Sequence, residues 1–262
     1  MGRVLKKGTV RMKSGNHAGK SQNYYITLLS KKDLPDIMAL QEIIFRHLHC
    51  SEILEPFTED FMKAHLSDKG FVVGLFSDEK LAAFRNVYYP EIGEHNWNLG
   101  MDIGLCNEEL ADVANLQMVC VHPDYRGNGL ALKMNRISLR LLSEHGTYEH
   151  ICATVSPYNF WNIRILLDSG FHIRSLKRKY GGKLRYIVYQ RLRNPVVFDG
   201  CTAIKSSLND FYTQKKLLAD GYCGLAVTSK GTRGQNRDPL KMNQWNLIFM
   251  RPKSICEARY CA

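Results

Sequence analysis

Residues 116–131 read Leu-Gln-Met-Val-Cys-Val-His-Pro-Asp-Tyr-Arg-Gly-Asn-Gly-Leu-Ala. The apolar first part predicts a buried strand, and the apolar side chains that recur at helical spacing after Gly129 predict an amphipathic helix. Between them, Gly127, Gly129 and Ala131 leave the backbone almost uncovered. The first N–H groups of a helix have no acceptor inside it, and the helix dipole adds partial positive charge there. The turn is therefore predicted to bind a phosphate group.

The chain on both sides of this turn shows a regular order of strands and helices. Apolar runs and alternation predict the strands 24–29, 71–76, 81–89, 115–121, 150–155, 171–179 and 183–191. Helical spacing and capping residues predict the helices 33–48, 58–70, 129–145 and 159–169. Short turns make two of the strand pairs antiparallel hairpins, whereas strand, helix and strand over 115–155 form a parallel crossover. The fold class is therefore α/β, more strictly α+β.

Length and charge suggest three segments. The 262 residues suffice for one large domain with an appendage, and no apolar run is long enough to span a membrane. Residues 1–21 are basic and lack the apolar segment of a secretory signal, so we expect a disordered arm. Residues 22–193 form the main domain. Residues 194–262 form an extension packed on it, with a helix at 207–220, strands at 222–227 and 245–250, and a mobile glycine-rich loop at 229–239.

The eight cysteines are scattered, without a C-x-x-C pair or a metal-binding pattern. This usage indicates reduced, buried side chains, a cytoplasmic protein and no metal site. The net charge of +11 is concentrated in the N-terminal arm and in residues 171–193, where eight Lys and Arg residues occur without an acidic one. That basic run is either a solvated face or a surface for an acidic acceptor or a phosphorylated cofactor.

The motifs resemble the GCN5-related N-acetyltransferase (GNAT) superfamily. Arg126-x-x-Gly129-x-Ala131 fits its acyl-CoA signature and follows the usual strand and a Val-His-Pro-Asp-Tyr lead. Asn159, followed eleven residues later by Gly170-Phe171, fits its second recurring pattern. A dinucleotide fingerprint would need a third glycine where Leu132 stands. The resemblance covers about two thirds of the chain and implies a mixed, centrally splayed sheet flanked by helices, with a C-terminal helix and strand appendage.

The resemblance also implies how acetyl-CoA binds. Backbone amides of the turn hold its pyrophosphate, the last strand residues bind the pantetheine arm as an added strand, and the amide near Val119 is the oxyanion donor. Arg126 adds a charged contact, and Asn159 either touches the pantetheine or orders the neighbouring turn. The cofactor-binding residues implied are Val119, Cys120, Val121, Arg126, Gly127, Asn128, Gly129, Leu130, Ala131 and Asn159.

At the proton-transfer positions the sequence departs from the family. Leu166 stands where a tyrosine acid often occurs, and Gln117 where a strand glutamate often occurs. Neither side chain transfers a proton. The substitute acids that the sequence offers are Tyr158 and Tyr180, and the substitute bases are Asp102, Glu108 and His122. A dedicated acid is dispensable if the CoA thiolate, with a thiol pKa of roughly 8.5, leaves unaided.

Two functions follow from this sequence. The first is an acetyl-CoA-dependent N-acetyltransferase, in which a primary amine of a small molecule or peptide attacks the thioester directly in a ternary complex. The second is a GNAT-shaped regulatory module that binds acyl-CoA, or a nucleic acid, with little or no turnover. We do not expect a nucleic-acid partner, because no recognisable RNA- or DNA-binding motif is present. The extension covers the sheet, closes over the acceptor groove or forms a homodimer contact.

Overall fold

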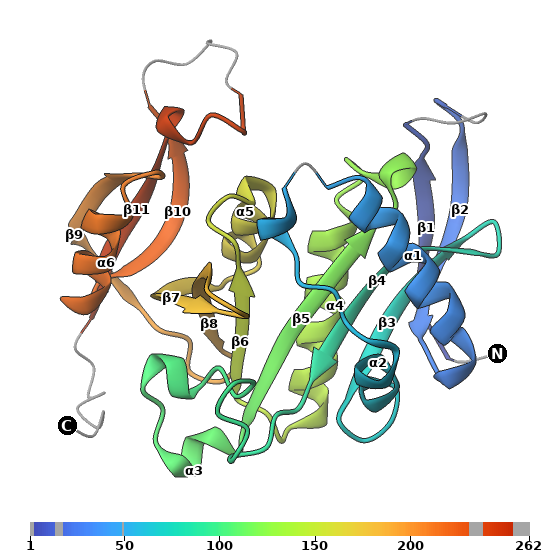
Figure 1. Ribbon diagram of the computed structural model, residues 1–262, viewed down its shortest axis with the longest axis horizontal. Helices are drawn as coiled ribbons and strands as arrows, with labels where there is room; N and C mark the ends of the chain where they lie inside the picture. The colour runs from blue at the N-terminus through green and yellow to red at the C-terminus, as the bar shows by residue number, and fades with distance from the viewer. Residues whose placement is uncertain (1–2, 14–17, 49, 231–237, 254–262) are drawn as a thin grey trace. The chain divides into compact units, whose positions relative to one another are not determined.

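The computed structural model describes residues 3–13, 18–48, 50–230 and 238–253. Its internal contacts divide the chain into two compact units: Met1–Tyr89 with Asn115–His145, and Pro90–Ala114 with Gly146–Ala262. Figure 1 shows the chain coloured by residue number. This division runs through residues 22–193, for which the sequence predicts one domain, and the second unit includes the extension 194–262. No helix in the described ranges is long and apolar enough to cross a bilayer.

The first unit contains five described strands, in which each pairs antiparallel with the next along the chain. They are β1 (Val4–Arg11), β2 (Ser21–Leu28), β3 (Gly70–Ser77), β4 (Lys80–Tyr88) and β5 (Val113–Val121), the last of which enters this unit at Asn115. The hairpin of β3 and β4 confirms the antiparallel pair that the sequence predicts there.

The strand β1 corrects one expectation. The prediction of a disordered arm over residues 1–21 is wrong for Val4–Arg11, which pairs with β2 as far as Arg11 opposite Ser21. Most side chains of this strand are exposed, and Val10 is the fully buried one. The sequence does not reveal this strand, since one buried apolar position in a segment that carries Lys6 and Lys7 gives no alternating signal. Residues 1–2 and 14–17 of the expected arm lie outside the described residues.

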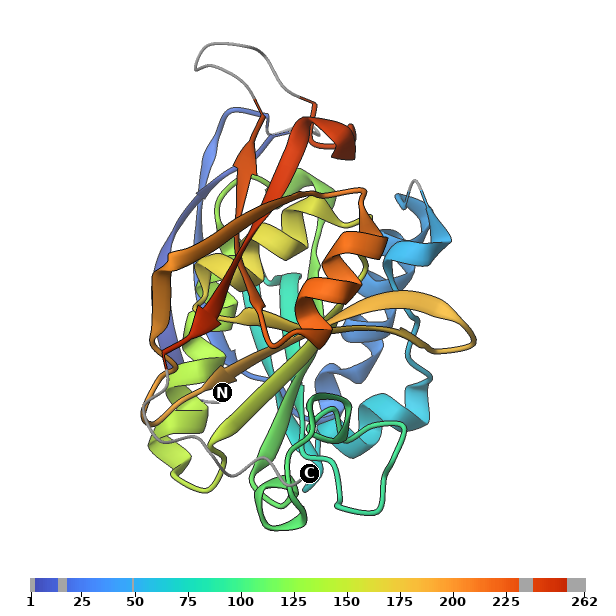
Figure 2. The ribbon, with the colours of Figure 1, turned by 90° about the vertical axis from the view of Figure 1, so that its left-hand side faces the viewer.

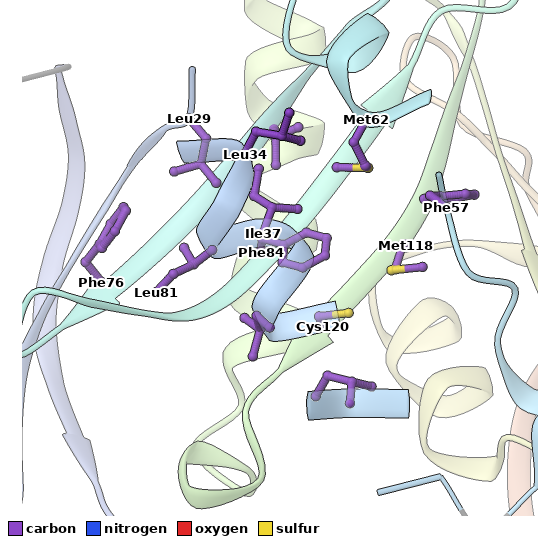
Figure 3. Close-up of a cluster of buried hydrophobic side chains, with 13 residues drawn as sticks. Leu29, Leu34, Ile37, Phe57, Met62, Phe76, Leu81, Phe84, Met118 and Cys120 are labelled. Atoms are coloured by element: carbon purple, nitrogen blue, oxygen red, sulfur yellow. The ribbon is translucent and has the colours of Figure 1, made fainter. Parts of the chain in front are cut away.

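Helices cover both faces of the first sheet. The helices α1 (Leu34–Arg46) and α2 (Glu59–His65) pack on one face and α4 (Leu130–His145) on the other (Figure 1). In the first of these layers, Ile37 of α1 and Met62 of α2 lie against Phe84 of β4 and against Met118 and Cys120 of β5 (Figure 3). Burial of these apolar faces supplies the main stabilisation of the helices. Two short 3-10 helices, Lys31–Asp33 and Ser51–Ile53, lie in the connections.

In the second unit the described strands follow the order β6-β8-β7-β10-β11-β9, and neighbours in this order pair antiparallel. Their bounds are β6 (His150–Val155), β7 (His172–Lys179), β8 (Lys183–Arg191), β9 (Phe198–Ser207), β10 (Cys223–Ser229) and β11 (Trp245–Pro252). The helices are α3 (Asn107–Leu110), α5 (Phe160–Asp168) and α6 (Phe211–Ala219), with 3-10 turns at Met101–Ile103 and Met242–Gln244. Both α5 and α6 pack against β10 (Figure 2).

The extension continues the sheet of the second unit. Gly224 of β10 pairs with Ile173 of β7, and a Cβ at Gly224 would lie only 3.1 Å from the Ile173 side chain, so the strands meet where one side chain is absent. The sequence predicts no strand at β9, which lies at the sheet edge, where Ser206 is its one buried residue. In the predicted mobile loop, residues 231–237 lie outside the described part of the chain.

Candidate functional site

The turn between β5 and α4 has the geometry of an anion cradle. A 3-10 turn (Pro123–Tyr125) follows β5, and the positive φ angles of Gly127 (79°) and Gly129 (66°) then reverse the chain into α4. The N–H groups of Gly127 and Gly129 donate to no other described residue. The first bond within the helix is Lys133 N–H to Gly129 C=O at 3.0 Å, so the N–H groups before Lys133 have no acceptor in the helix.

The space in front of this turn is open. A Cβ built on Gly129 would meet no protein atom within 4 Å, whereas a Cβ on Gly127 would collide with the ammonium of Lys13. The backbone at Gly129 is therefore accessible to a ligand, and the positive end of the 16-residue helix α4 lies behind it. A phosphate group fits this combination of free amides, open space and positive charge.

Side chains of the predicted cradle have different roles. Arg126 is exposed, and its Nε donates to Val121 C=O at 3.3 Å, which folds the guanidinium back over the end of β5. The Asn128 side chain bonds to the backbone of Arg11 instead of facing solvent. Leu130 is buried in the core under α4. Of this set, Arg126 alone offers a charged side chain, and the rest contribute through the backbone.

A β-bulge interrupts β5 just before the cradle. Arg85 of β4 pairs with Val119, but Val87 pairs with Leu116. Between these two pairs β5 therefore has one residue more than β4. The unpaired residues are Gln117 and Met118. A bulge of this kind bends a strand and re-aims its neighbouring backbone groups. The predicted binding strand Val119–Val121 begins immediately after it.

Two buried side chains of β4 form hydrogen bonds with the backbone groups of the bulge. Arg85 Nη1 donates to Gln117 C=O at 3.2 Å, and Met118 N–H donates to Asn86 Oδ1 at 2.8 Å. Both side chains are at most 1 % exposed. Neither residue was among those predicted from the sequence, although an arginine inside the apolar run 81–89 is an unusual feature that marks them.

Burial governs the ionisation of Arg85 and Cys120. Desolvation lowers the pKa of the Arg85 guanidinium to about 9, so the side chain is charged at neutral pH. Its Nε and Nη2 have no hydrogen-bond partner among the described residues. Burial raises the pKa of the Cys120 thiol, which therefore stays neutral. The Cys120 side chain thus packs in the core as a neutral thiol, and only its backbone groups can contact a ligand.

His122 caps the 3-10 turn. Its Nδ1 accepts the Asp124 N–H at 3.3 Å, and partial burial lowers the pKa of the ring. A neutral ring whose Nδ1 already accepts this bond has no further lone pair for a proton. These contacts favour a structural role over that of a general base.

Asp102, another candidate base, lies in the second unit. Its carboxylate is 14 % exposed and bonds to Lys177 Nζ at 3.3 Å and Lys179 Nζ at 2.7 Å. Both ammonium groups belong to β7, and each contacts a different oxygen of the carboxylate. Asp102 thereby anchors the loop 90–112 to β7. Glu108 lies in α3, where contacts with its own backbone and the Cys106 thiol lower the carboxyl pKa.

The remaining candidates lie around α5 and the β7–β8 turn of the second unit. Asn159 caps α5, because its Oδ1 accepts Asn162 N–H at 3.1 Å, and Tyr158 beside it is 44 % exposed. Tyr180 occupies the β7–β8 turn with φ of 50°, and its hydroxyl lies 3.3 Å from Thr154 Oγ1 of β6. Leu166 is buried in the interior of α5. Tyr158 and Tyr180 therefore offer their phenol hydroxyls from separate elements.

Four of the eight cations in the basic run over 171–193 form ion pairs. Arg191 and Arg193 pair with Glu149, and the two lysines of β7 pair with Asp102. Arg185 is 3 % exposed and donates to Leu184 C=O. Within the described residues, no group of three metal-ligating side chains is found.

Comparison with solved structures identifies the architecture. The acetyltransferase of GNAT family from Streptococcus pneumoniae matches with a TM-score of 0.50 at 15 % identity, covering 64 % of this chain and 98 % of that one. An N-acetyltransferase from Staphylococcus aureus Mu50 gives 0.50 at 15 % identity, with 65 % and 99 % covered. The yncA protein from Salmonella typhimurium, solved with its cofactor acetyl-CoA, gives 0.51 at 16 % identity, with 68 % and 99 % covered.

The chain has the GNAT fold. The resemblance predicted from the motifs and the predicted α+β class are confirmed at the level of the fold. No protein-family model matches the sequence, and no curated protein matches it either. The GNAT fold gives the cradle its context, while the chemistry of the cradle rests on the residues described above.

Proposed function

We propose that this GNAT-fold protein is an acetyl-CoA-dependent N-acetyltransferase that acts on a primary amine of a small molecule or peptide. The observation that carries the proposal is the turn from β5 to α4, where the N–H groups of Gly127 and Gly129 have no acceptor and the backbone at Gly129 faces open space. These amides and Arg126 would hold the pyrophosphate. The six described cysteines are free thiols, which supports a reducing compartment such as the cytoplasm.

The backbone after the bulge supports acyl transfer. Bound acetyl-CoA supplies an acetyl thioester, whose carbonyl carbon forms a bond to the amine nitrogen as the C–S bond breaks. The proton lost by the amine balances the proton gained by the CoA thiol. Val119 N–H is our candidate donor to the carbonyl oxygen, and the bulge held by Arg85 and Asn86 sets its direction. Tyr158 and Tyr180 are the candidate acids.

The second candidate is a module that binds acyl-CoA with little or no turnover. Asp102 and His122, two of the proton acceptors that the sequence offers, are held in an ion pair and a cap. The side chains of Gln117 and Leu166 cannot replace them, because neither accepts or donates a proton in catalysis. This candidate shares the cradle with the enzyme and differs from it in the chemical step alone.

Release of free thiol from acetyl-CoA distinguishes the two candidates. The protein is incubated with acetyl-CoA and a panel of polyamines, amino acids, aminoglycosides and basic peptides. An N-acetyltransferase releases thiol in proportion to one acceptor, and Tyr180→Phe and Tyr158→Phe then show which hydroxyl lowers kcat. Binding of acetyl-CoA without thiol release across the panel would support the non-catalytic module and contradict the enzyme.

A further inference from the structure

A cationic groove begins at the cradle and continues along α4. A cavity of about 290 Å³ is lined by Gly129 of the turn, by Lys133, Arg136 and Arg140 of α4 and by Lys6 of β1. The four charged side chains come from two elements that lie far apart in sequence. Because Gly129 belongs to both the groove and the cradle, the two form one continuous surface.

The charge of this groove is incompletely balanced. Arg140 pairs with Glu144 at 3.5 Å. Lys133 donates to the Tyr24 hydroxyl at 2.5 Å, and this neutral partner does not balance the charge of Lys133. Lys6 and Arg136 have no ion-pair partner among the described residues. No Asp or Glu of the described chain lines the cavity. Clustered cations without acidic neighbours attract a multiply charged anion.

The strand β1 is fastened to the cradle, so its lysines are held in place. Lys13 N–H donates to Asp124 C=O at 2.9 Å, and Asn128 bonds to both backbone groups of Arg11. The ammonium of Lys13 lies directly over Gly127, since a Cβ on that glycine would collide with Lys13 Nζ. The N-terminal segment therefore places Lys13 beside the turn and Lys6 in the groove along α4.

We propose that this groove binds the 3′-phosphate of the CoA nucleotide. The inference rests on the proposed function, because the ligand is the same molecule. The ribose of CoA carries the pyrophosphate on one carbon and the 3′-phosphate on another, so the two anions lie one sugar apart. Lys133 and Arg136 follow Gly129 by roughly 6 and 10 Å along the helix axis, which matches that spacing. Arg and Lys together suit the three acceptor oxygens of a phosphate monoester.

The test compares CoA with 3′-dephospho-CoA, which lacks only this phosphate. Dissociation constants are measured by isothermal titration for the wild type, for a Lys6→Ala/Arg136→Ala variant and for Lys7→Ala. Lys7 is a matched control, because it neighbours Lys6 in β1, carries the same charge and does not line the groove. We expect the wild type to prefer CoA by about tenfold. The double variant loses this preference, and Lys7→Ala retains it.

The outcomes separate this inference from the proposed function. Equal affinity of the wild type for the two ligands overturns the 3′-phosphate site while the acetyl-CoA cradle stands. An equal loss of preference in Lys7→Ala also overturns it, because the effect would then be one of general charge. If neither ligand binds at millimolar concentration, the proposed function itself fails.

Discussion

Asn128 holds the backbone of Arg11 from both sides: its Nδ2 donates to Arg11 C=O at 2.9 Å, and its Oδ1 accepts Arg11 N–H at 3.0 Å. The same Nδ2 also donates to Tyr125 C=O at 2.9 Å. A single side chain at the centre of the glycine turn thus pairs with β1 as a neighbouring strand would. The N-terminal strand and the candidate phosphate turn are consequently parts of one structure.

Removing the Asn128 amide should destabilise both the strand β1 and the glycine turn. Asn128→Ala deletes three hydrogen bonds, and we expect it to lower the free energy of unfolding by about 1–3 kcal/mol and to weaken acetyl-CoA binding. Urea unfolding and isothermal titration measure the two effects. Arg11→Ala is the control, because it keeps the backbone groups that Asn128 contacts. Similar losses in both variants would show that the Arg11 side chain, and not this pairing, matters.

The bulge in β5 predicts a second effect. Asn86→Leu leaves the Met118 N–H buried without an acceptor, which costs about 1–3 kcal/mol of stability. Asn86→Asp preserves the acceptor oxygen and should keep the bulge. If the bulge aims the Val119 amide, kcat falls in the leucine variant more than in the aspartate variant. Leucine and aspartate variants with the same stability would refute the assigned role of Asn86.

Asp102 gives a third prediction, which separates an anchor from a base. Asp102→Asn leaves Lys179, 11 % exposed, without its counter-ion, and should cost about 2 kcal/mol of stability. The variant Asp102→Asn/Lys179→Met removes both charges and should recover much of that loss together with the activity. Chemical denaturation measures the stability, and thiol release measures the activity. Recovered stability with activity still absent would instead identify Asp102 as the base.

Buried histidines predict loss of stability in acid. Desolvation lowers the pKa of His65 to about 4 and that of His172 to about 3, from a usual value of 6.5. Below pH 6.5 the unfolded chain therefore binds protons that the folded chain does not, so the free energy of unfolding falls as the pH falls. For His65 the loss is complete near pH 4 and is on the order of 3 kcal/mol.

His65→Phe checks this assignment. The ring packs among Phe57, Phe61 and Tyr88, which suits an aromatic replacement. Urea midpoints between about pH 7.5 and 4 should decline less steeply in this variant than in the wild type. An unchanged slope would mean that His65 does not contribute.

The part of the fold nearest the cradle was the most predictable from sequence. The run ending in Val119–Val121, the glycines and the periodic α4 all carry strong local signals, because burial on both faces makes a strand continuously apolar and a turn with positive φ requires glycine. The helix cap at Asn159 has a similar local signal.

Features that depend on distant contacts escaped prediction. Half of the residues of β1 are charged or polar, and its place is set by pairing with β2 and by Asn128. The bulge at Gln117 and Met118 depends on how β5 pairs with β4, and the sequence of one strand does not specify that register. The ion pairs of Asp102 join residues 75 and 77 positions apart, so spacing alone left Asp102 as a base candidate.

The phosphate cradle is tested most directly by the affinity for acetyl-CoA when the open space in front of Gly129 is filled. Isothermal titration is carried out on the wild type, Gly129→Val and Gly221→Val. Gly221 is the matched control, because it also has a positive φ, 83° against 66°, and no atom within 4 Å of a Cβ, but lies after α6. We predict that the wild type and Gly221→Val bind alike and that Gly129→Val binds at least about tenfold more weakly. Equal affinity in all three proteins would contradict a phosphate cradle at this turn.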